Sequence, residues 1–174
     1  MSYKENSILI NKKKFKCVIQ GEGPLVLLVH GWPETWVSWK RQISLISKLG
    51  FMVCAFNTRG YGGSLCPKNI SDYSLKFFME DILDIISFFK KDKAILIGHD
   101  WGAPICWTTA AYYKNKVSGV IGLSVPFTRR GKISSTKLWK KLYKNIFFYQ
   151  NYFQKIDIAE NELEKNISIS LQKI

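Results

Sequence analysis

The chain has 174 residues, of which 47% are apolar, and this is enough for one compact domain with a buried core. Its formal net charge is +13, and the only arginines among the 26 basic residues are Arg41, Arg59, Arg129 and Arg130. Phosphate and base recognition favour arginine, so this lysine-rich balance predicts solvated surface lysines and no nucleic-acid partner.

The cysteines, the histidines and the N-terminus argue against a metal site, a secreted protein and a membrane-spanning protein. The four cysteines form no C-x-x-C pair, and two histidines are too few for a zinc cluster. We therefore expect reduced thiols, no metal and no organic cofactor. The N-terminus is polar without a signal-peptide core, and the apolar run at 25–29 is too short to span a bilayer. The expected protein is cytoplasmic, with no membrane partner.

Short apolar or alternating runs predict strands, and amphipathic runs between them predict helices. Gly50 ends the first predicted helix, and Ser74 can cap the second. Alternating strands and helices favour a mostly parallel sheet with right-handed crossovers. The predicted strands are 7–10, 15–19, 25–29, 51–56, 94–97 and 117–125, and the predicted helices are 35–48, 74–89 and 103–113.

The composition of the sequence changes after Pro126. The following residues are polar, basic and aromatic, with helical stretches but no further strand. We therefore predict two parts: residues 1–126, which form the sheet and its helices, and residues 127–174, which form a partial helical lid. In parallel sheets the active site lies at the C-terminal ends of the strands, which here are followed by the loops after Val29, Phe56 and Ile97.

The strongest motif is Gly-His-Asp-Trp-Gly at residues 98–102, between a predicted strand and a predicted helix. It resembles the G-x-S-x-G nucleophile elbow of α/β-hydrolases, with Asp100 in the serine position. The bend lifts its central side chain above the sheet, and the close packing of strand and helix leaves no room for a Cβ on either side. Asp100 is therefore the predicted nucleophile.

An aspartate in this position restricts the chemistry. Unlike a serine, it is already anionic at neutral pH and needs no base to attack. Its attack on a carbonyl would give an anhydride, whereas displacement at a saturated carbon gives an alkyl ester. The suitable substrate is a small apolar epoxide or a haloalkane, and not a peptide or a simple ester.

A second motif, His-Gly-Trp-Pro-Glu at residues 30–34, follows the first core strand. In α/β-hydrolases this loop supplies one oxyanion N–H and the residue after the nucleophile supplies the other, which predicts the amides of Trp32 and Trp101. His30, Gly31 and Pro33 are assigned to the substrate-binding loop, where His30 supports the loop and is not a general base. His99 is likewise expected to point away from the tip of the elbow.

Together with Arg-Gly-Tyr-Gly-Gly-Ser at 59–64, these motifs resemble the epoxide hydrolases of the α/β-hydrolase superfamily. Runs at 148–154 and 159–164 resemble a stretch of the family's lid, so that the resemblance extends from about Tyr3 to Asn166. It implies an α/β-hydrolase fold. It also implies that Tyr149 is the lid tyrosine that donates a hydrogen bond to the epoxide oxygen. Relatives commonly have Asp at the position of Asn57, which we expect to be structural.

Two alternatives remain. Haloalkane dehalogenases share the aspartate elbow, but they usually have an asparagine at the position of Trp32 to hold halide, and fluoroacetate-type dehalogenases tend to have arginine at the position of Trp101. A dehalogenase-like hydrolase is therefore the second hypothesis. The third is a non-catalytic α/β-hydrolase-derived module that binds a ligand or a partner.

The family's second lid tyrosine, catalytic acid and catalytic histidine have no counterpart among these residues. Ser124 and Pro126 flank Val125 where an acid could follow the last predicted strand, and His30 and His99 are already assigned. We therefore expect an incomplete fold, truncated within the lid, that can form the alkyl ester on Asp100 but does not turn over.

Overall fold

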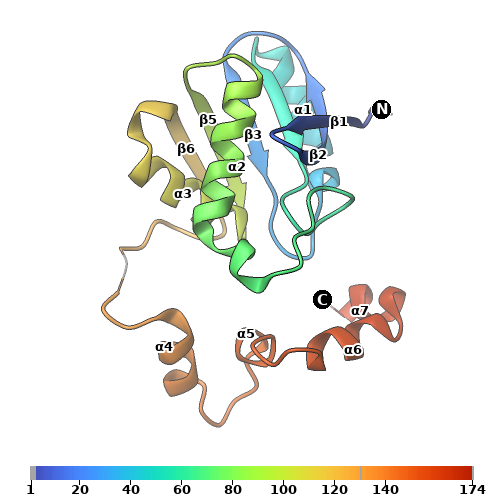
Figure 1. Ribbon diagram of the computed structural model, residues 1–174, viewed down its shortest axis with the longest axis vertical. Helices are drawn as coiled ribbons and strands as arrows, with labels where there is room; N and C mark the ends of the chain where they lie inside the picture. The colour runs from blue at the N-terminus through green and yellow to red at the C-terminus, as the bar shows by residue number, and fades with distance from the viewer. Residues whose placement is uncertain (1–2, 130, 174) are drawn as a thin grey trace. The chain divides into compact units, whose positions relative to one another are not determined.

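The computed structural model describes residues 3–129 and 131–173. The chain divides into two compact units, residues 1–127 and residues 128–174. The first unit holds the sheet and its helices, and the second holds short helices (Figure 1).

Six strands form one mixed sheet in the described part of the first unit, in the order β1-β2-β4-β3-β5-β6. β1 pairs antiparallel with β2, and β2 with β4, whereas β4, β3, β5 and β6 are parallel. The sheet is therefore mostly parallel, as predicted. The strands are β1 (Asn6–Ile10), β2 (Lys13–Gln20), β3 (Leu25–Val29), β4 (Met52–Phe56), β5 (Ala94–His99) and β6 (Val117–Leu123).

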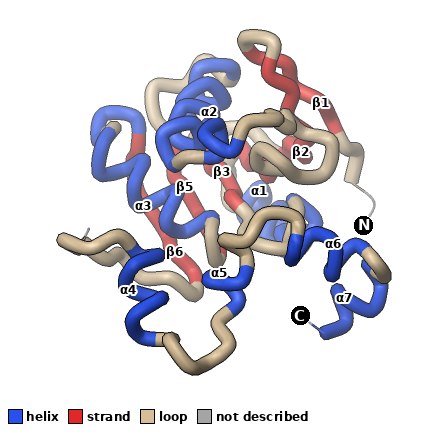
Figure 2. Tube along the Cα trace, turned by 60° about the horizontal axis from the view of Figure 1, so that its bottom comes forward, coloured by secondary structure: helices blue, strands red, loops and turns tan. Residues whose placement is uncertain are grey.

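Helices cover both faces of this sheet. A 3₁₀ turn, η1 (Trp36–Trp39), and helix α1 (Lys40–Lys48) pack on one face, and α2 (Leu75–Phe88) and α3 (Gly102–Tyr112) pack on the other (Figures 1 and 2). Two further 3₁₀ turns, η2 (Ile70–Tyr73) and η3 (Lys114–Lys116), precede α2 and β6.

Strand β3 lies at the centre of the core, and all five of its side chains are buried. Successive side chains of a strand point to opposite faces, and here Leu27 joins the cluster beneath α2 and α3 while Leu28 joins the cluster beneath η1 and α1. A continuous apolar run is thus needed because helices bury both sides of this strand.

The structure corrects several details of the predicted elements. The helix predicted at 35–48 begins with a 3₁₀ turn capped by the side chain of Thr35. Ser74 occupies the N-cap position of α2, but its side chain makes no capping hydrogen bond. β6 ends at Leu123, two residues before the predicted end, because Ser124 has φ +68° and leaves the extended conformation.

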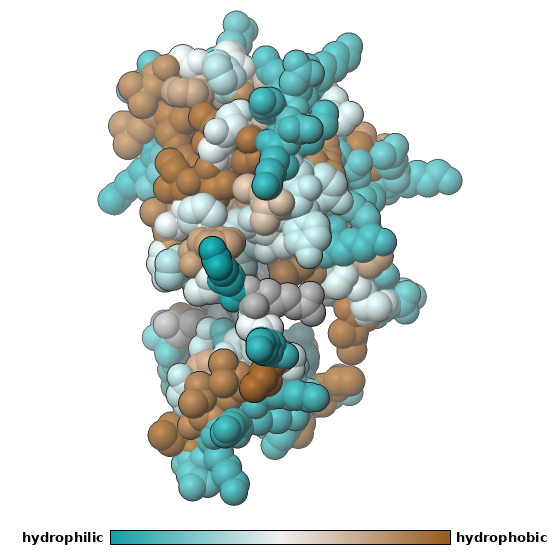
Figure 3. All heavy atoms as spheres, turned by 90° about the vertical axis from the view of Figure 1, so that its left-hand side faces the viewer, coloured by the Kyte–Doolittle hydropathy of each residue, from teal (hydrophilic) through white to brown (hydrophobic). Residues whose placement is uncertain are grey.

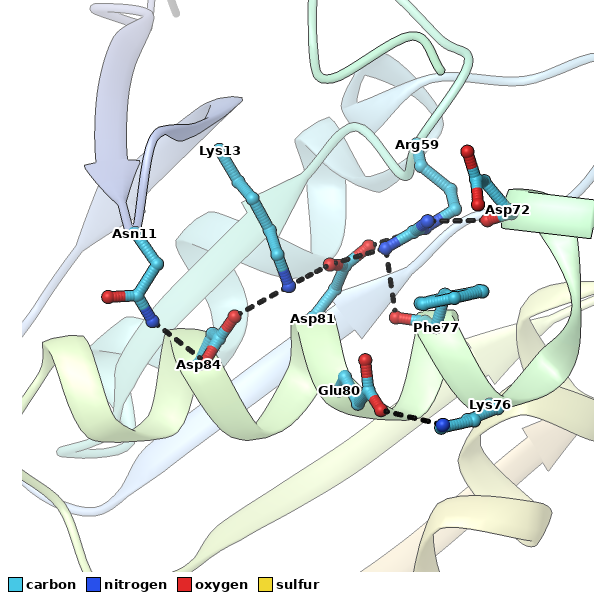
Figure 4. Close-up of polar contacts among 9 residues, drawn as sticks. All are labelled: Asn11, Lys13, Arg59, Asp72, Lys76, Phe77, Glu80, Asp81 and Asp84. Atoms are coloured by element: carbon cyan, nitrogen blue, oxygen red, sulfur yellow. Dashed lines mark hydrogen bonds and ion pairs between the residues drawn. The ribbon is translucent and has the colours of Figure 1, made fainter. Parts of the chain in front are cut away.

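A buried ion pair joins the loop after β4 to helix α2 (Figure 4). Arg59 donates from Nε to Asp81 Oδ2 at 2.8 Å and from Nη2 to Asp81 Oδ1 at 2.7 Å, and both side chains are only 3% exposed. The guanidinium also donates to the carbonyls of Asp72 and Phe77. Lys13 of β2 contacts Asp81 and Asp84 beside it. This network fixes the loop that follows β4.

The face of β6 opposite α3 is apolar and exposed. Gly122 points toward Trp107 of α3, whereas Ile121 and Leu123 on the other face are 50% and 41% exposed. β6 is also an edge of the sheet, paired only with β5 among the described strands. Exposed apolar side chains of this kind are more typical of a strand inside a sheet than of an edge strand.

In the residues of the second unit that the structure describes there are four short helices: α4 (Ser135–Leu142), α5 (Tyr149–Tyr152), α6 (Ile158–Glu164) and α7 (Ile167–Lys173). An aromatic cluster holds its first half together, in which Phe148 stacks on Tyr143 at 4.2 Å between ring centroids and meets Trp139 edge to face. Within the described residues, no helix is both long enough and apolar enough to cross a membrane.

Candidate active site

Asp100 lies in a sharp bend between β5 and α3. Its φ of +49° lies in the left-handed region, where residues other than glycine are uncommon. Its amide donates to the carbonyl of Leu123 in β6, and its carbonyl accepts from the amide of Ala103 in α3. The side chain is half-buried and forms no ion pair with any described residue. The bend thus presents an unpaired carboxylate at the C-terminal edge of the sheet.

The glycines on either side of this bend are required by close backbone contacts. A Cβ on Gly98 would lie 2.3 Å from the carbonyl oxygen of Gly102, and a Cβ on Gly102 would lie 2.0 Å from that of Val29. Both distances are far below contact, and neither backbone can give way easily. The motif spacing therefore reflects the packing of α3 against β5 and β3.

The loop after β3 reaches the Asp100 carboxylate through its backbone. The amide of Trp32 donates to Asp100 Oδ1 at 2.9 Å. Gly31 lies against the same side chain, because a Cβ there would stand 2.4 Å from Asp100 Oδ1. The Trp32–Pro33 peptide bond is cis. One predicted oxyanion donor thus already contacts one carboxylate oxygen.

His30 is buried beneath this loop. Its Nε2 accepts from the amide of Thr58 at 3.0 Å, so Nδ1 carries the proton and donates to the carbonyl of Gly31 at 2.8 Å. Burial lowers the pKa of His30 from its ordinary value, and the bond to Gly31 opposes this only partly. Both ring nitrogens are engaged, which supports the interpretation of His30 as a loop-supporting residue.

Glu34 ties this loop to the elbow, which the sequence analysis did not foresee. Its Oε2 accepts from the amide of Gly31 at 3.2 Å and from Nδ1 of His99 at 3.1 Å. His99 directly precedes Asp100, so one carboxylate oxygen joins the two segments that place the Trp32 amide against the Asp100 carboxylate. The sequence signal for this residue was its place at the end of the His-Gly-Trp-Pro-Glu motif.

For the epoxide opening predicted from the sequence, replacing Glu34 with alanine should slow alkylation of Asp100 about tenfold, because it removes a half-buried acceptor of two hydrogen bonds at a cost of about 1 kcal/mol or more and leaves the loop untied. Glu34→Gln retains an acceptor and should stay near the wild-type rate. Intact-mass time courses with an epoxide measure both rates. Equal rates for the alanine variant and the wild type would show that the tie is unimportant.

Two other residues lie near Asp100. Trp101 is the N-cap residue of α3 and is 43% exposed, with its amide directly after Asp100 in the chain. Tyr61 packs edge to face against His30. Burial, with a smaller contribution from the charge of Asp100, raises the pKa of Tyr61 to about 12. Tyr61 was given no role from the sequence, although its glycine-rich loop was noted.

Asn57 joins the first two strand-end loops. Its Oδ1 accepts from the amide of Trp36 at 2.7 Å, and its Nδ2 donates to the carbonyl of Gly62 at 3.1 Å. An aspartate could make the first bond but could not donate the second. The amide therefore suits its position and supports the expected structural role.

Tyr149 belongs to the second unit, where it begins α5. Its phenol oxygen accepts from Nε2 of Gln150 at 2.9 Å, and its ring meets Phe153 edge to face.

The structure thus brings Asp100, Gly31 and Trp32 together within the first unit, with Glu34 as an addition. No group of three or more His, Cys, Asp or Glu side chains in the described ranges is placed to hold a metal ion.

Comparison with known proteins identifies relatives along most of the chain. The alpha/beta hydrolase fold family matches residues 24–173. Bifunctional epoxide hydrolase 2 of Sus scrofa is 38% identical over 151 residues, which cover 86% of this chain and 27% of that protein. Epoxide hydrolase A of Mycobacterium tuberculosis is 32% identical over 172 residues, which cover 98% of this chain and 53% of that protein.

A solved structure agrees closely in fold. The crystal structure of Epoxide Hydrolase A from Mycobacterium thermoresistibile superposes with a TM-score of 0.93 at 36% identity, covering 97% of this chain and 54% of that one. This chain therefore spans about half the length of the epoxide hydrolase A proteins that it matches. The predicted resemblance to epoxide hydrolases of the α/β-hydrolase fold is confirmed.

Proposed function

Because this chain belongs to the α/β-hydrolase fold family, in its epoxide hydrolase branch, we propose that it opens an epoxide by covalent attack of Asp100. The observation that carries the proposal is the unpaired carboxylate of Asp100 in a left-handed bend, with one oxygen already held by the Trp32 amide. Oδ1 is thereby occupied, which leaves Oδ2 to attack.

In the proposed step, Oδ2 forms a bond to an epoxide carbon while the ring C–O bond breaks. The electron pair of that bond goes to the former ring oxygen, which takes the proton of the Tyr149 phenol. The product is a hydroxyalkyl ester of Asp100. The amides of Trp32 and Trp101 would stabilise the oxyanion that forms when water later attacks this ester, and losing one such donor costs about 10²- to 10³-fold in rate.

Hydrolysis of the ester requires a general base, which contributes about 10²- to 10⁴-fold. The 174 residues contain two histidines, and both are engaged: His30 with Thr58 and Gly31, and His99 with Glu34. Both ring nitrogens of His30 are engaged, and we propose that His99, bound to Glu34 through Nδ1, holds the loop and does not serve as the base. We therefore propose that these 174 residues form the ester and retain it.

The test uses intact-mass spectrometry of the folded protein after incubation with styrene oxide or with a bromoalkane. The exposed thiol of Cys66 could also be alkylated, so the protein carries Cys66→Ser, while the other three thiols are buried. We expect one persistent adduct with the epoxide. An adduct with the bromoalkane alone would instead indicate a dehalogenase-like enzyme, and no adduct with either would indicate a binding module.

Replacing Tyr149 with phenylalanine should slow formation of the epoxide adduct about 10²-fold or more, because the departing ring oxygen loses its proton donor. Tyr152→Phe, three residues along the same helix, provides a matched control and should stay near the wild-type rate. Adduct time courses for both variants decide the point. An unchanged rate in Tyr149→Phe would remove this residue from the mechanism.

A further inference from the structure

Positive charge is concentrated in one short stretch of the second unit. Residues 129–148 contain seven basic residues and no acidic one, so these 20 residues carry seven of the chain's net 13 positive charges. Four of the lysines lie on α4 or directly after it, and all four are exposed: Lys137, Lys140, Lys141 and Lys144. The i, i+3, i+4 spacing of Lys137, Lys140 and Lys141 places them on one side of the helix, and Lys144 follows in the turn after it.

Large apolar side chains are exposed in the same stretch. Leu138 and Leu142, one helical turn apart, are 41% and 62% exposed, and Ile146 and Phe147 are 68% and 76% exposed. The rings of Trp139 and Tyr143, by contrast, pack on Phe148 and are occupied within the unit. Figure 3 shows apolar and hydrophilic side chains next to one another over this unit.

We propose that residues 133–147 form a docking surface for an anionic lipid bilayer. A short helix with lysines on one face and leucines on another, followed by a turn with exposed Ile and Phe side chains, can lie in the plane of the interface, with its apolar side chains among the acyl chains. Each lysine near an anionic leaflet adds to the attraction, and the lysine stems extend toward the headgroups.

The apolar side chains favour a bilayer over nucleic acid. A nucleic-acid groove would leave Ile146 and Phe147 without apolar surroundings, whereas a bilayer buries them. The inference departs from the expectation that the lysines are only solvated, because the sequence did not show that apolar side chains remain exposed beside them. It does not depend on the proposed chemistry at Asp100, which lies in the other unit.

The test measures cosedimentation of the full 174-residue chain with phosphatidylcholine vesicles, with and without phosphatidylglycerol. Binding is expected only with phosphatidylglycerol and should weaken as salt is raised. Replacing Lys137, Lys140, Lys141 and Lys144 with glutamine should reduce the affinity about tenfold or more. The control replaces Lys48, Lys68, Lys93 and Lys114, exposed residues of the first unit, and removes the same charge.

Phe147→Ser tests the apolar contribution without changing the charge, and it should also weaken binding severalfold. Circular dichroism confirms that each variant is folded. The proposal is overturned by any of three results: no binding to phosphatidylglycerol vesicles, equal loss in the two lysine sets, or unchanged binding by Phe147→Ser. Tighter binding to duplex DNA than to the vesicles would also overturn it.

Discussion

Asp100→Asn should abolish the epoxide adduct while leaving the fold intact. The amide has the same shape and can occupy the same bend, but it carries no negative charge and is not a nucleophile toward a saturated carbon. Since the carboxylate is the attacking group in the proposed reaction, we expect no adduct over a period in which the parent protein is fully labelled. Intact-mass spectra of both proteins, in the Cys66→Ser background, make the comparison.

The control for this result is the stability of the variant. Asp100 forms no ion pair with a described residue, and Asn can still accept from the amide of Trp32. Urea unfolding curves of the two proteins should therefore nearly coincide. An adduct of equal yield in Asp100→Asn would contradict the proposed nucleophile, and it would redirect the search to another side chain.

The second large effect is expected on stability. Asp81→Asn should lower the free energy of unfolding by about 3–5 kcal/mol, because it leaves the buried guanidinium of Arg59 without its countercharge. Arg59 and Asp81 are both 3% exposed and share two hydrogen bonds, and Lys13 loses a partner as well. Urea denaturation followed by circular dichroism measures the change.

A surface pair on the same helix provides the matched control. Lys76 and Glu80 are joined at 3.9 Å, with side chains 70% and 36% exposed (Figure 4). Glu80→Gln should change the free energy of unfolding by less than about 0.5 kcal/mol, because exposed pairs contribute little. If both variants lost the same amount, the Arg59–Asp81 pair would not be the anchor of the loop after β4.

The pattern of apolar residues predicted most of the fold, because the elements that it marks are buried on defined faces. The run at 25–29 is β3 without a change of boundary, and the helices fall within a few residues of their predicted ends. The mixed character of the sheet was harder to predict. β1 and β2 are antiparallel because a short turn at Asn11 and Lys12, both with positive φ, joins them directly.

The candidate site, like the fold, could be predicted from the sequence only in part. Motif glycines predicted the bend at Asp100 because backbone contacts leave no room for a Cβ there. The pairing of Glu34 with His99 and the burial of Arg59 against Asp81 depend on contacts between segments distant in sequence. The His-Gly-Trp-Pro-Glu motif contains Glu34, but no local pattern shows which distant residue such a side chain contacts, and charged residues are ordinarily expected to be solvated.

The most direct test of the account is to locate the adduct in the chain. After reaction with styrene oxide, tryptic digestion yields the peptide 94–114, which contains both Asp100 and Cys106, and fragmentation separates the two. We predict that the added mass lies on Asp100 and is lost on mild alkaline hydrolysis, as expected of an ester. An adduct on Cys106, or on any residue outside this peptide, with Asp100 unmodified, would contradict the central claim.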